Sequence, residues 1–312
     1  MIWREGEILT EKSVSASEGR RSSSLGVLLL IISSLLWGGE FVVAKDVLNV
    51  LDPNWSNAIR TFFTSVLALI IWRKHFKAAT LQDWKRGTIC SVMFGGAFAL
   101  QIMGLELINA GINAFLSAAY IIMIPFVVWI IEKTRPAGKV FISAVIGIIG
   151  VAIMSVTGLS SGELSIGTGE ILSLLSAIGY GGAIVSADYY TQKSSVEFIT
   201  GCQFIFTFVI AMICAFIMED LPSITLTVPV VLEFIYLIVF GTFITQLLFT
   251  MGMKYASANQ AGVIYPLESV SAAVLGCIFL GERLAPIQIA GAVMIVAAII
   301  INNISFKKEP RI

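Results

Sequence analysis

The stretch SSLLWGGEFVVAKDV, residues 33–47, decides the fold because a related stretch, SAIGYGGAIVSADYY, returns 143 residues later at 176–190. In both stretches an aromatic residue precedes a Gly–Gly pair. Further along, GLELINAGINAF at 104–115 matches GMKYASANQAGV at 252–263 with a shift of 148. Internal repeats of this length determine the architecture of a chain. The sequence therefore predicts two related halves, and the growth of the shift from 143 to 148 indicates that the second half has gained five residues.

The composition is that of a membrane protein. Of the 312 residues, 57% are hydrophobic and 13% are charged, and the mean hydropathy is +0.91. A soluble domain carries about 25% charged residues. Such a chain cannot cover a water-facing surface, so we expect the lipid bilayer as its main partner. The net charge of zero indicates no nucleic-acid partner, and the four cysteines form no CxxC pair, so we expect no metal site and no cofactor.

Ten apolar runs approach the roughly 20 residues that a helix needs to cross a hydrocarbon core of about 30 Å. Backbone groups in lipid must bond within their own segment, so each run is predicted as a helix. Five crossings per unit is an odd number, so two tandem units must enter the bilayer from opposite sides. The prediction is an all-α integral membrane protein with ten transmembrane helices as two inverted five-helix repeats. The runs lie near 25–44, 56–72, 87–104, 110–131, 139–157, 168–187, 197–218, 231–251, 258–280 and 285–304.

The distribution of Lys and Arg predicts the orientation. With the N-terminus inside, the inner loops and tails hold 17 of these residues, whereas the outer loops hold only Arg283. This is the positive-inside bias, so both termini are predicted to be cytoplasmic, in the cell (plasma or inner) membrane. The predicted organisation is a disordered cytoplasmic tail at 1–24, a first repeat at 25–157, a second repeat at 168–304 and a C-terminal tail at 305–312.

Several segments together resemble one known family. They are LLWGGEFVVAK at 35–45, ELINAGINAFLSAAYIIMIP at 106–125, GEILSLLSAIGYGGAIVSADYY at 169–190 and LGERL at 280–284. From about residue 25 to 304, the chain resembles the ten-helix EamA-type branch of the drug/metabolite transporter superfamily. The resemblance implies a basket-like bundle of two inverted halves around a central cavity. It also implies transport by alternating access, usually outward export of small metabolites or drugs.

Three ionisable residues fall near the predicted outer ends of the first two spans: Glu40, Lys45 and Arg60. Such groups within a span are costly and mark functional candidates when a partner can be named. One hypothesis is an ion-pair cluster that fixes the two spans, with Lys45 and Arg60 reaching the headgroups. The other hypothesis, for Glu40, is pocket lining or proton binding. The preceding Gly38–Gly39 pair favours it, because a helix or a substrate could approach the backbone closely there.

Glu268 lies some ten residues into the ninth predicted span, roughly 12 to 15 Å deep at about 1.5 Å per residue. Pro266 removes a backbone hydrogen bond beside it, and Ser269 stands where the family often has Pro. A carboxyl at such depth is expected to be neutral unless it is paired. This favours a proton carrier, while the alternative is a protonated Glu that hydrogen-bonds between helices.

Uncharged polar side chains within the apolar runs form a second group of candidates. Polar groups also join helices, at about 0.6 kcal/mol on average, which is the favoured role for any one of them alone. Together with Trp37 they suit an amphipathic solute. The proton-coupling candidates are Glu268 and Glu40, and no catalytic residue is predicted. The predicted substrate-binding residues are Trp37, Glu40, Gln101, Asn113, Tyr120, Tyr180, Gln203, Gln246, Tyr265 and Glu268.

The leading functional hypothesis is a secondary transporter, favoured as an exporter of a small organic metabolite such as an amino acid or of a drug-like solute, with proton coupling left open. One alternative is an uncoupled facilitator or exchanger of the nucleotide-sugar or phosphate-ester type. Those carriers need cations in the cavity, whereas here the cations are predicted near the span ends. A lipid-modifying enzyme is the weakest alternative, because the one histidine, His75, is predicted in a basic loop. A homodimer is left open.

Overall fold

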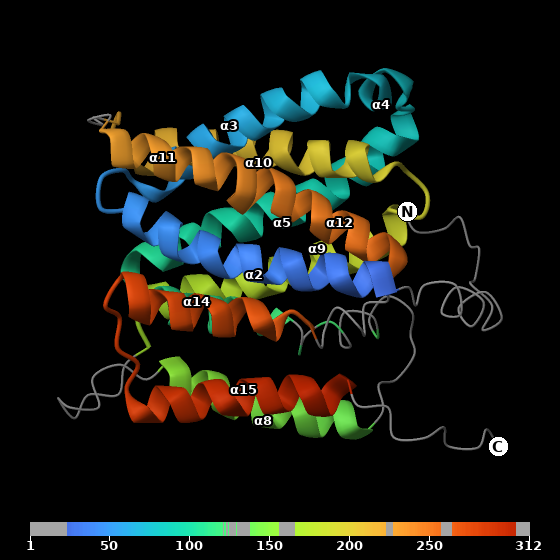
Figure 1. Ribbon diagram of the computed structural model, residues 1–312. Coiled ribbons are helices and arrows are strands. Elements are labelled where there is room, and N and C mark those ends of the chain that lie inside the picture. The colour runs from blue at the N-terminus through green and yellow to red at the C-terminus, as the bar shows by residue number, and fades with distance from the viewer. Residues whose placement is uncertain are drawn as a thin grey trace, which may run out of the picture.

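All regular structure in the described residues of the computed structural model is helical, and the helices lie lengthwise beside one another in one bundle (Figure 1). The two predicted tails fall outside these residues, apart from Ser24, where the first helix begins. Most of the second half of the predicted fourth span, near 121–131, also falls outside them. The described residues are 24–120, 122, 124, 129, 138–155, 166–222, 227–256 and 264–303.

Each of the ten predicted spans contains a helix in the described part of the chain. By length and composition, α2, α5, α9, α10 and the continuous run Val228–Tyr255 could each cross a membrane. The first unit holds α2 (Ser24–Val47), α3 (Pro53–Ile71), the short α4 (Arg73–Ala78), α5 (Leu81–Leu107), α6 (Ala110–Ser117) and α8 (Gly138–Ser155). The second unit holds α9 (Thr168–Tyr190), α10 (Val196–Met218), α11 (Val228–Tyr236), the π-helix η1 (Leu237–Ile244), α12 (Thr245–Tyr255), α14 (Pro266–Phe279) and α15 (Pro286–Asn303).

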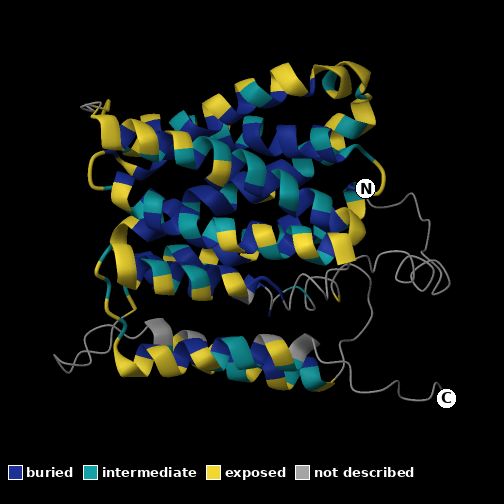
Figure 2. Cartoon of the chain, in the orientation of Figure 1, coloured by how far each residue is buried: buried dark blue, intermediate teal, exposed yellow. Residues whose placement is uncertain are grey.

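The outer faces of the helices are exposed and apolar (Figure 2). Ile70 on α3, Ile217 on α10 and Phe279 on α14 are 66%, 77% and 72% exposed. Apolar surface on this scale is unfavourable in water and is rare on soluble monomers. It suits the hydrocarbon core of a bilayer. The chain is therefore an integral membrane protein.

The two units interlock in the same way. The first helix of the first unit, α2, packs against α12 and α14, the third and fourth helices of the second unit. Reciprocally, the first helix of the second unit, α9, packs against α5 and α6. Because each unit has five helices, the repeats run in opposite directions through the bundle. The structure is thus the predicted pair of inverted repeats.

Close approaches at glycines follow the two shifts read from the sequence. A Cβ atom at Gly26 of α2 would lie 2.9 Å from the backbone at Tyr255 and Ala256. At Gly169 of α9, 143 residues later, it would lie 2.9 Å from the Cβ of Leu107, which is 148 residues before Tyr255. Glycine is needed at both places because the helices touch there through their backbones.

The extra residues of the second unit lie mostly in its second helix. The helices α3 and α10 begin at equivalent residues, Pro53 and Val196, which are 143 apart. However, α3 has 19 residues and α10 has 23. One additional helical turn at the end of α10 therefore accounts for most of the five-residue gain, which the sequence alone could not locate.

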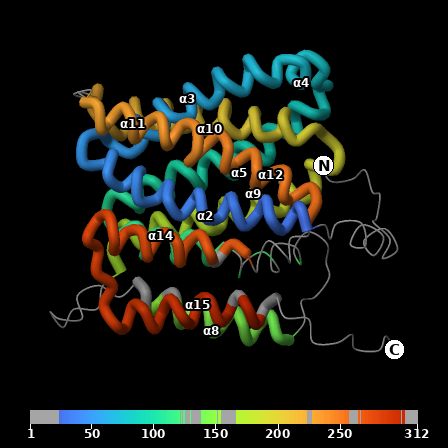
Figure 3. Tube along the Cα trace, in the orientation of Figure 1, coloured from blue at the N-terminus to red at the C-terminus, as the bar shows by residue number. Residues whose placement is uncertain are grey.

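The fifth helices of the two units, α8 and α15, pack against each other at one edge of the bundle (Figure 3). A Cβ at Gly150 of α8 would lie 2.9 Å from the backbone oxygen of Gly291 on α15. The start of α2 and the end of α15 lie at the same end of the bundle (Figure 1), as an even number of crossings requires. The side of the membrane that this end faces stays a prediction.

Candidate substrate-binding site

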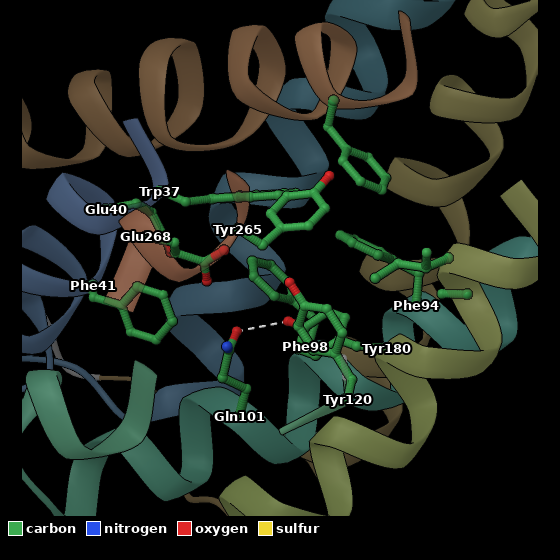
Figure 4. A pocket seen from close by; sticks show the side chains of 13 residues that line it. Trp37, Glu40, Phe41, Phe94, Phe98, Gln101, Tyr120, Tyr180, Tyr265 and Glu268 are labelled. Atoms are coloured by element: carbon green, nitrogen blue, oxygen red, sulfur yellow. Dashed lines mark hydrogen bonds between the residues drawn. The ribbon is translucent and has the colours of Figure 1, made fainter. Parts of the chain in front are cut away.

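A pocket lies between the two units (Figure 4). Its empty volume is about 480 Å³, within the range of small-molecule sites. The first, third and fourth spans of both units contribute to its walls. The lining residues are Trp37, Glu40 and Phe41 of α2; Phe94, Phe98 and Gln101 of α5; Tyr120 just after α6; Tyr180, Ala183 and Ile184 of α9; Phe249 of α12; Tyr265 just before α14; and Glu268 of α14.

Helical periodicity directs these side chains to the pocket. The lining residues of α2 follow an i, i+3, i+4 pattern, which places them on one helix face. The lining residues of α9 follow the same pattern exactly one shift of 143 later, so Trp37 corresponds to Tyr180 and Glu40 to Ala183. The two walls thus share one geometry and differ in chemistry, since only the α2 wall carries a carboxylate.

Aromatic rings form a connected series along the pocket. The centroid of the Tyr120 ring lies 6.0 Å from that of Tyr180 and 6.1 Å from that of Tyr265. Tyr265 continues the series to Trp37, at 6.2 Å, and to Phe249, at 5.6 Å. These separations are typical of aromatic pairs that stabilise one another. The pocket therefore presents a wall of ring faces and edges to whatever occupies it.

An ion pair lies behind the α2 wall. Arg60 Nη1 of α3 donates to Glu40 Oε1, and both side chains are buried. Arg60 Nε also donates to Asn57 Oδ1 at 2.9 Å, and the guanidinium lies 4.2 Å from the ring centroid of Phe98. A buried charge needs such a set of partners to offset its lost hydration. Glu40 thus enters the pocket wall already paired.

Two expectations about the cations are wrong. Arg60 is only 1% exposed and does not reach the headgroups, because α2 and α3 extend about one turn beyond the predicted spans and place the pair deeper. Lys45 does not reach them either, since its Nζ donates to the carbonyl oxygens of Leu105 and Glu106 at 2.7 and 2.8 Å. These carbonyls end α5, where a cation is favourable. The expected ion pair between α2 and α3 is confirmed for Glu40 and Arg60.

Glu268 is the second carboxyl group of the pocket. It lies in the first turn of α14 and is 7% exposed. Among the described residues, its carboxylate has no hydrogen bond or ion pair, and the charged group it senses is Glu40. Figure 4 shows this carboxylate among the rings of Phe41 and Tyr265, on the pocket side of α14. The site therefore contains one paired carboxylate and one without a protein partner.

The contact between α2 and α14 at this level depends on Gly38. A Cβ at Gly38 would lie 2.9 Å from the carbonyl oxygen of Glu268 and would meet the side chain of Ser271. We expect Gly38→Ala to lower the free energy of unfolding by about 1–3 kcal/mol, as overpacking does. The control is Gly96→Ala in α5, where a Cβ meets nothing within 4 Å and the change should stabilise the helix slightly. Thermal unfolding of both variants in detergent measures the difference, and equal midpoints would contradict the prediction.

A model of one family matches the chain twice, at residues 24–156 and 167–304. Its description is the EamA-like transporter family. The chain belongs to this family. The resemblance read from the sequence segments is thereby confirmed, and the protein is a membrane transporter of this type.

Relatives of this EamA-like transporter have the same length and share about a quarter of its residues. An uncharacterized transporter of Archaeoglobus fulgidus is 25% identical over 94% of this chain and 90% of its own. The uncharacterized transporter YrdR of Bacillus subtilis is 23% identical over 91% and 93%. A solved crystal structure matches with a TM-score of 0.65 at 14% identity, over 90% of this chain and 98% of that chain, which supports the fold alone.

Three predicted site residues do not line this pocket of the EamA-like transporter. Asn113 Nδ2 instead donates to the backbone oxygen of Gln101 at 3.1 Å and to Ser173 Oγ at 2.8 Å. Gln246 Nε2 donates to Gln203 Oε1 at 2.9 Å, between α12 and α10. All three join helices, as polar groups in spans commonly do. The other seven predicted residues line the pocket, and their role in substrate binding stays a prediction.

The aromatic residues Phe41, Phe94, Phe98 and Phe249 also line the pocket but were not predicted. Their type offers no signal, because phenylalanine in an apolar run is equally suited to lipid or to the core. Spacing could have found some of them. Phe94 and Phe98 precede Gln101 by seven and three residues, so all three share one face of α5.

Proposed function

We propose that this EamA-like transporter is a secondary transporter of the cell membrane that exports a small organic solute by alternating access, in exchange for protons, with both termini in the cytoplasm. We propose no enzymatic activity. The observation that carries the finer part is Glu268, which is buried in a pocket between two inverted units and has no partner for its carboxylate among the described residues.

A buried carboxyl without a protein partner is tolerated when it holds a proton or a ligand. It can therefore alternate between the two if the pocket opens first to one side of the membrane and then to the other. The inverted repeat supplies two equivalent ways to open. Glu40, Tyr120 and Tyr265 are 5% exposed or less, so the pocket needs a conformational change before a solute can enter or leave.

The groups that face Glu268 set the conditions of this exchange. Glu40 of α2 is the neighbouring carboxyl, and Arg60 of α3 pairs with it. The tyrosines Tyr120 and Tyr265 are the other titratable neighbours, and their hydroxyls stay neutral near physiological pH. Glu268 is then the group in this pocket that is free to exchange a proton.

Transport in liposomes tests the proposal. The purified protein is reconstituted, an artificial pH gradient is imposed, and uptake or release is measured for a series of organic solutes. We expect accumulation of at least one solute against its own gradient, which collapses when a protonophore is added. Solute movement that ignores the pH gradient would replace the proposal by an uncoupled facilitator. Turnover of a lipid by the purified protein would contradict it altogether.

A further inference from the structure

The charges around the pocket add up to a single one. Besides tyrosines, the ionisable residues that line it are Glu40 and Glu268. Arg60 cancels the charge of Glu40, because the two side chains are joined and buried together. Lys45, on the same helix as Glu40, is bound to the end of α5. When Glu268 is ionised, the described pocket therefore carries one uncompensated negative charge.

The rings around this charge are suited to the same kind of ligand. Trp37, Tyr120, Tyr180 and Tyr265 all line the pocket, and their connected rings surround it with π faces. The face of an aromatic ring is negative and attracts a cation, most strongly where water is excluded. Aromatic rings combined with a carboxylate are how proteins recognise ammonium groups. An anion would be repelled by both components.

Polar groups at the pocket offer a place for a neutral polar end of the solute. The hydroxyl of Tyr265 is buried and has no hydrogen-bond partner among the described residues. Gln101 holds the hydroxyl of Tyr180 through its Oε1 at 2.6 Å, which leaves its amide hydrogens for a ligand. Neither group carries a charge. They can orient a solute but do not change the charge that the pocket selects.

A zwitterion fits less well than a cation. Its carboxylate needs a positive partner in the pocket, and the nearest candidate is Arg60. The guanidinium already binds Glu40 and Asn57, lies over Phe98 and does not line the pocket. An amino acid would therefore have to break a buried ion pair before its carboxylate could be bound.

We propose that the solute of this transporter is a small organic monocation with an aromatic or apolar body. Its cationic group binds the Glu268 carboxylate, and its body lies against the rings of Trp37, Tyr120 and Tyr265. Gln101 and the Tyr265 hydroxyl bind a polar end of the body. This substrate class rests on the proposed function, because it assigns the solute of the same site.

Calorimetric binding to the purified full chain in detergent tests the class with molecules that share a body and differ in charge. The phenol series is tyramine, para-ethylphenol, tyrosine and para-hydroxyphenylpropanoate. The indole series is tryptamine, ethylindole, tryptophan and indolepropanoate. We expect the amine to bind about tenfold or more tightly than the neutral, zwitterionic and anionic members of its series. The proposal is overturned if the amino acid or the neutral compound binds as tightly as the amine, or if neither amine binds at about 10 mM.

Variants of Glu268 locate the cation. Glu268→Gln should weaken amine binding about tenfold or more and leave the binding of the neutral compound unchanged. Glu268→Asp, which keeps the charge, should retain the preference for the amine. The matched control is Glu170→Gln in α9, a buried glutamate outside the pocket wall, which should bind all compounds as the unmodified protein does. Undiminished amine binding by Glu268→Gln would overturn the assignment.

The failure of the substrate class can be told apart from the failure of the proposed function. If a pH gradient drives a zwitterionic or neutral solute through Glu268 while the amines do not bind, the monocation class is wrong and coupled transport stands. If the amines bind through Glu268 but no gradient moves any solute, coupled transport is wrong and the monocation class stands.

Discussion

Glu268→Gln is expected to abolish pH-driven transport while the protein stays folded. Glutamine has nearly the same shape as protonated glutamic acid and cannot release a proton. Because the Glu268 carboxylate has no hydrogen bond or ion pair among the described residues, its replacement by an amide leaves no described charge unpaired. Solute flux in liposomes with and without a pH gradient measures the effect. Proton-coupled flux at the unmodified level would exclude Glu268 as the coupling residue.

Three controls separate a loss of coupling from a loss of structure. Thermal unfolding of Glu268→Gln in detergent should give a midpoint close to that of the unmodified protein. Glu268→Asp keeps an ionisable group and should recover pH-driven flux in part. Glu170→Gln tests the same chemical change at a buried site outside the pocket wall and should keep full flux. Loss of flux in Glu170→Gln would mean that the assay reports folding instead of coupling.

Arg60→Gln is expected to lower the free energy of unfolding by about 3–5 kcal/mol, because it leaves the Glu40 carboxylate buried without its partner. Glutamine is also the residue that the chain itself has at the equivalent position of the second unit, Gln203, where Ala183 stands opposite Glu40. The fold thus accepts glutamine there when no carboxylate faces it. Thermal or denaturant unfolding in detergent measures the change.

The double variant Glu40→Gln with Arg60→Gln should be more stable than Arg60→Gln alone, since it removes both charges together. Replacing a whole buried ion pair is often close to neutral, whereas removing one member is strongly destabilising. The four proteins form a double-mutant cycle whose coupling energy is the strength of the pair in its surroundings. A double variant that is as unstable as Arg60→Gln would show that the pair is not the source of the effect.

Much of the architecture could be predicted because it depends on local or additive properties of the chain. A run near twenty apolar residues predicts a span wherever it occurs, and a repeat of five spans predicts the inversion. The pairing of Gly26 with Tyr255, and of Gly169 with Leu107, follows the shifts of 143 and 148. The exact ends of helices were less accessible, because α2 runs on to Val47 through residues that the hydropathy pattern does not distinguish from a loop.

The candidate site could be predicted only in part. Trp37, Glu40 and Glu268 stood out as polar or amphipathic groups in apolar runs, and all three line the pocket. Gln203 stood out for the same reason, yet it binds Gln246 between α10 and α12. Residue type cannot separate these cases, because a polar side chain in a span satisfies the same need by facing a pocket or by joining helices.

By itself, the sequence determined that Gly38, Glu40 and Glu268 belong to a ten-helix inverted repeat, since hydropathy, odd span number and repeat register require no knowledge of side-chain contacts. The tertiary structure alone decided which carboxylate is paired. Glu40 and Arg60 are twenty residues apart on different helices, and their contact depends on how α2 and α3 are rotated about their axes. Rotation is set by the packing of all neighbours at once. That packing gives Glu40 its cation and leaves Glu268 without one in the described residues, although both are glutamates in apolar spans.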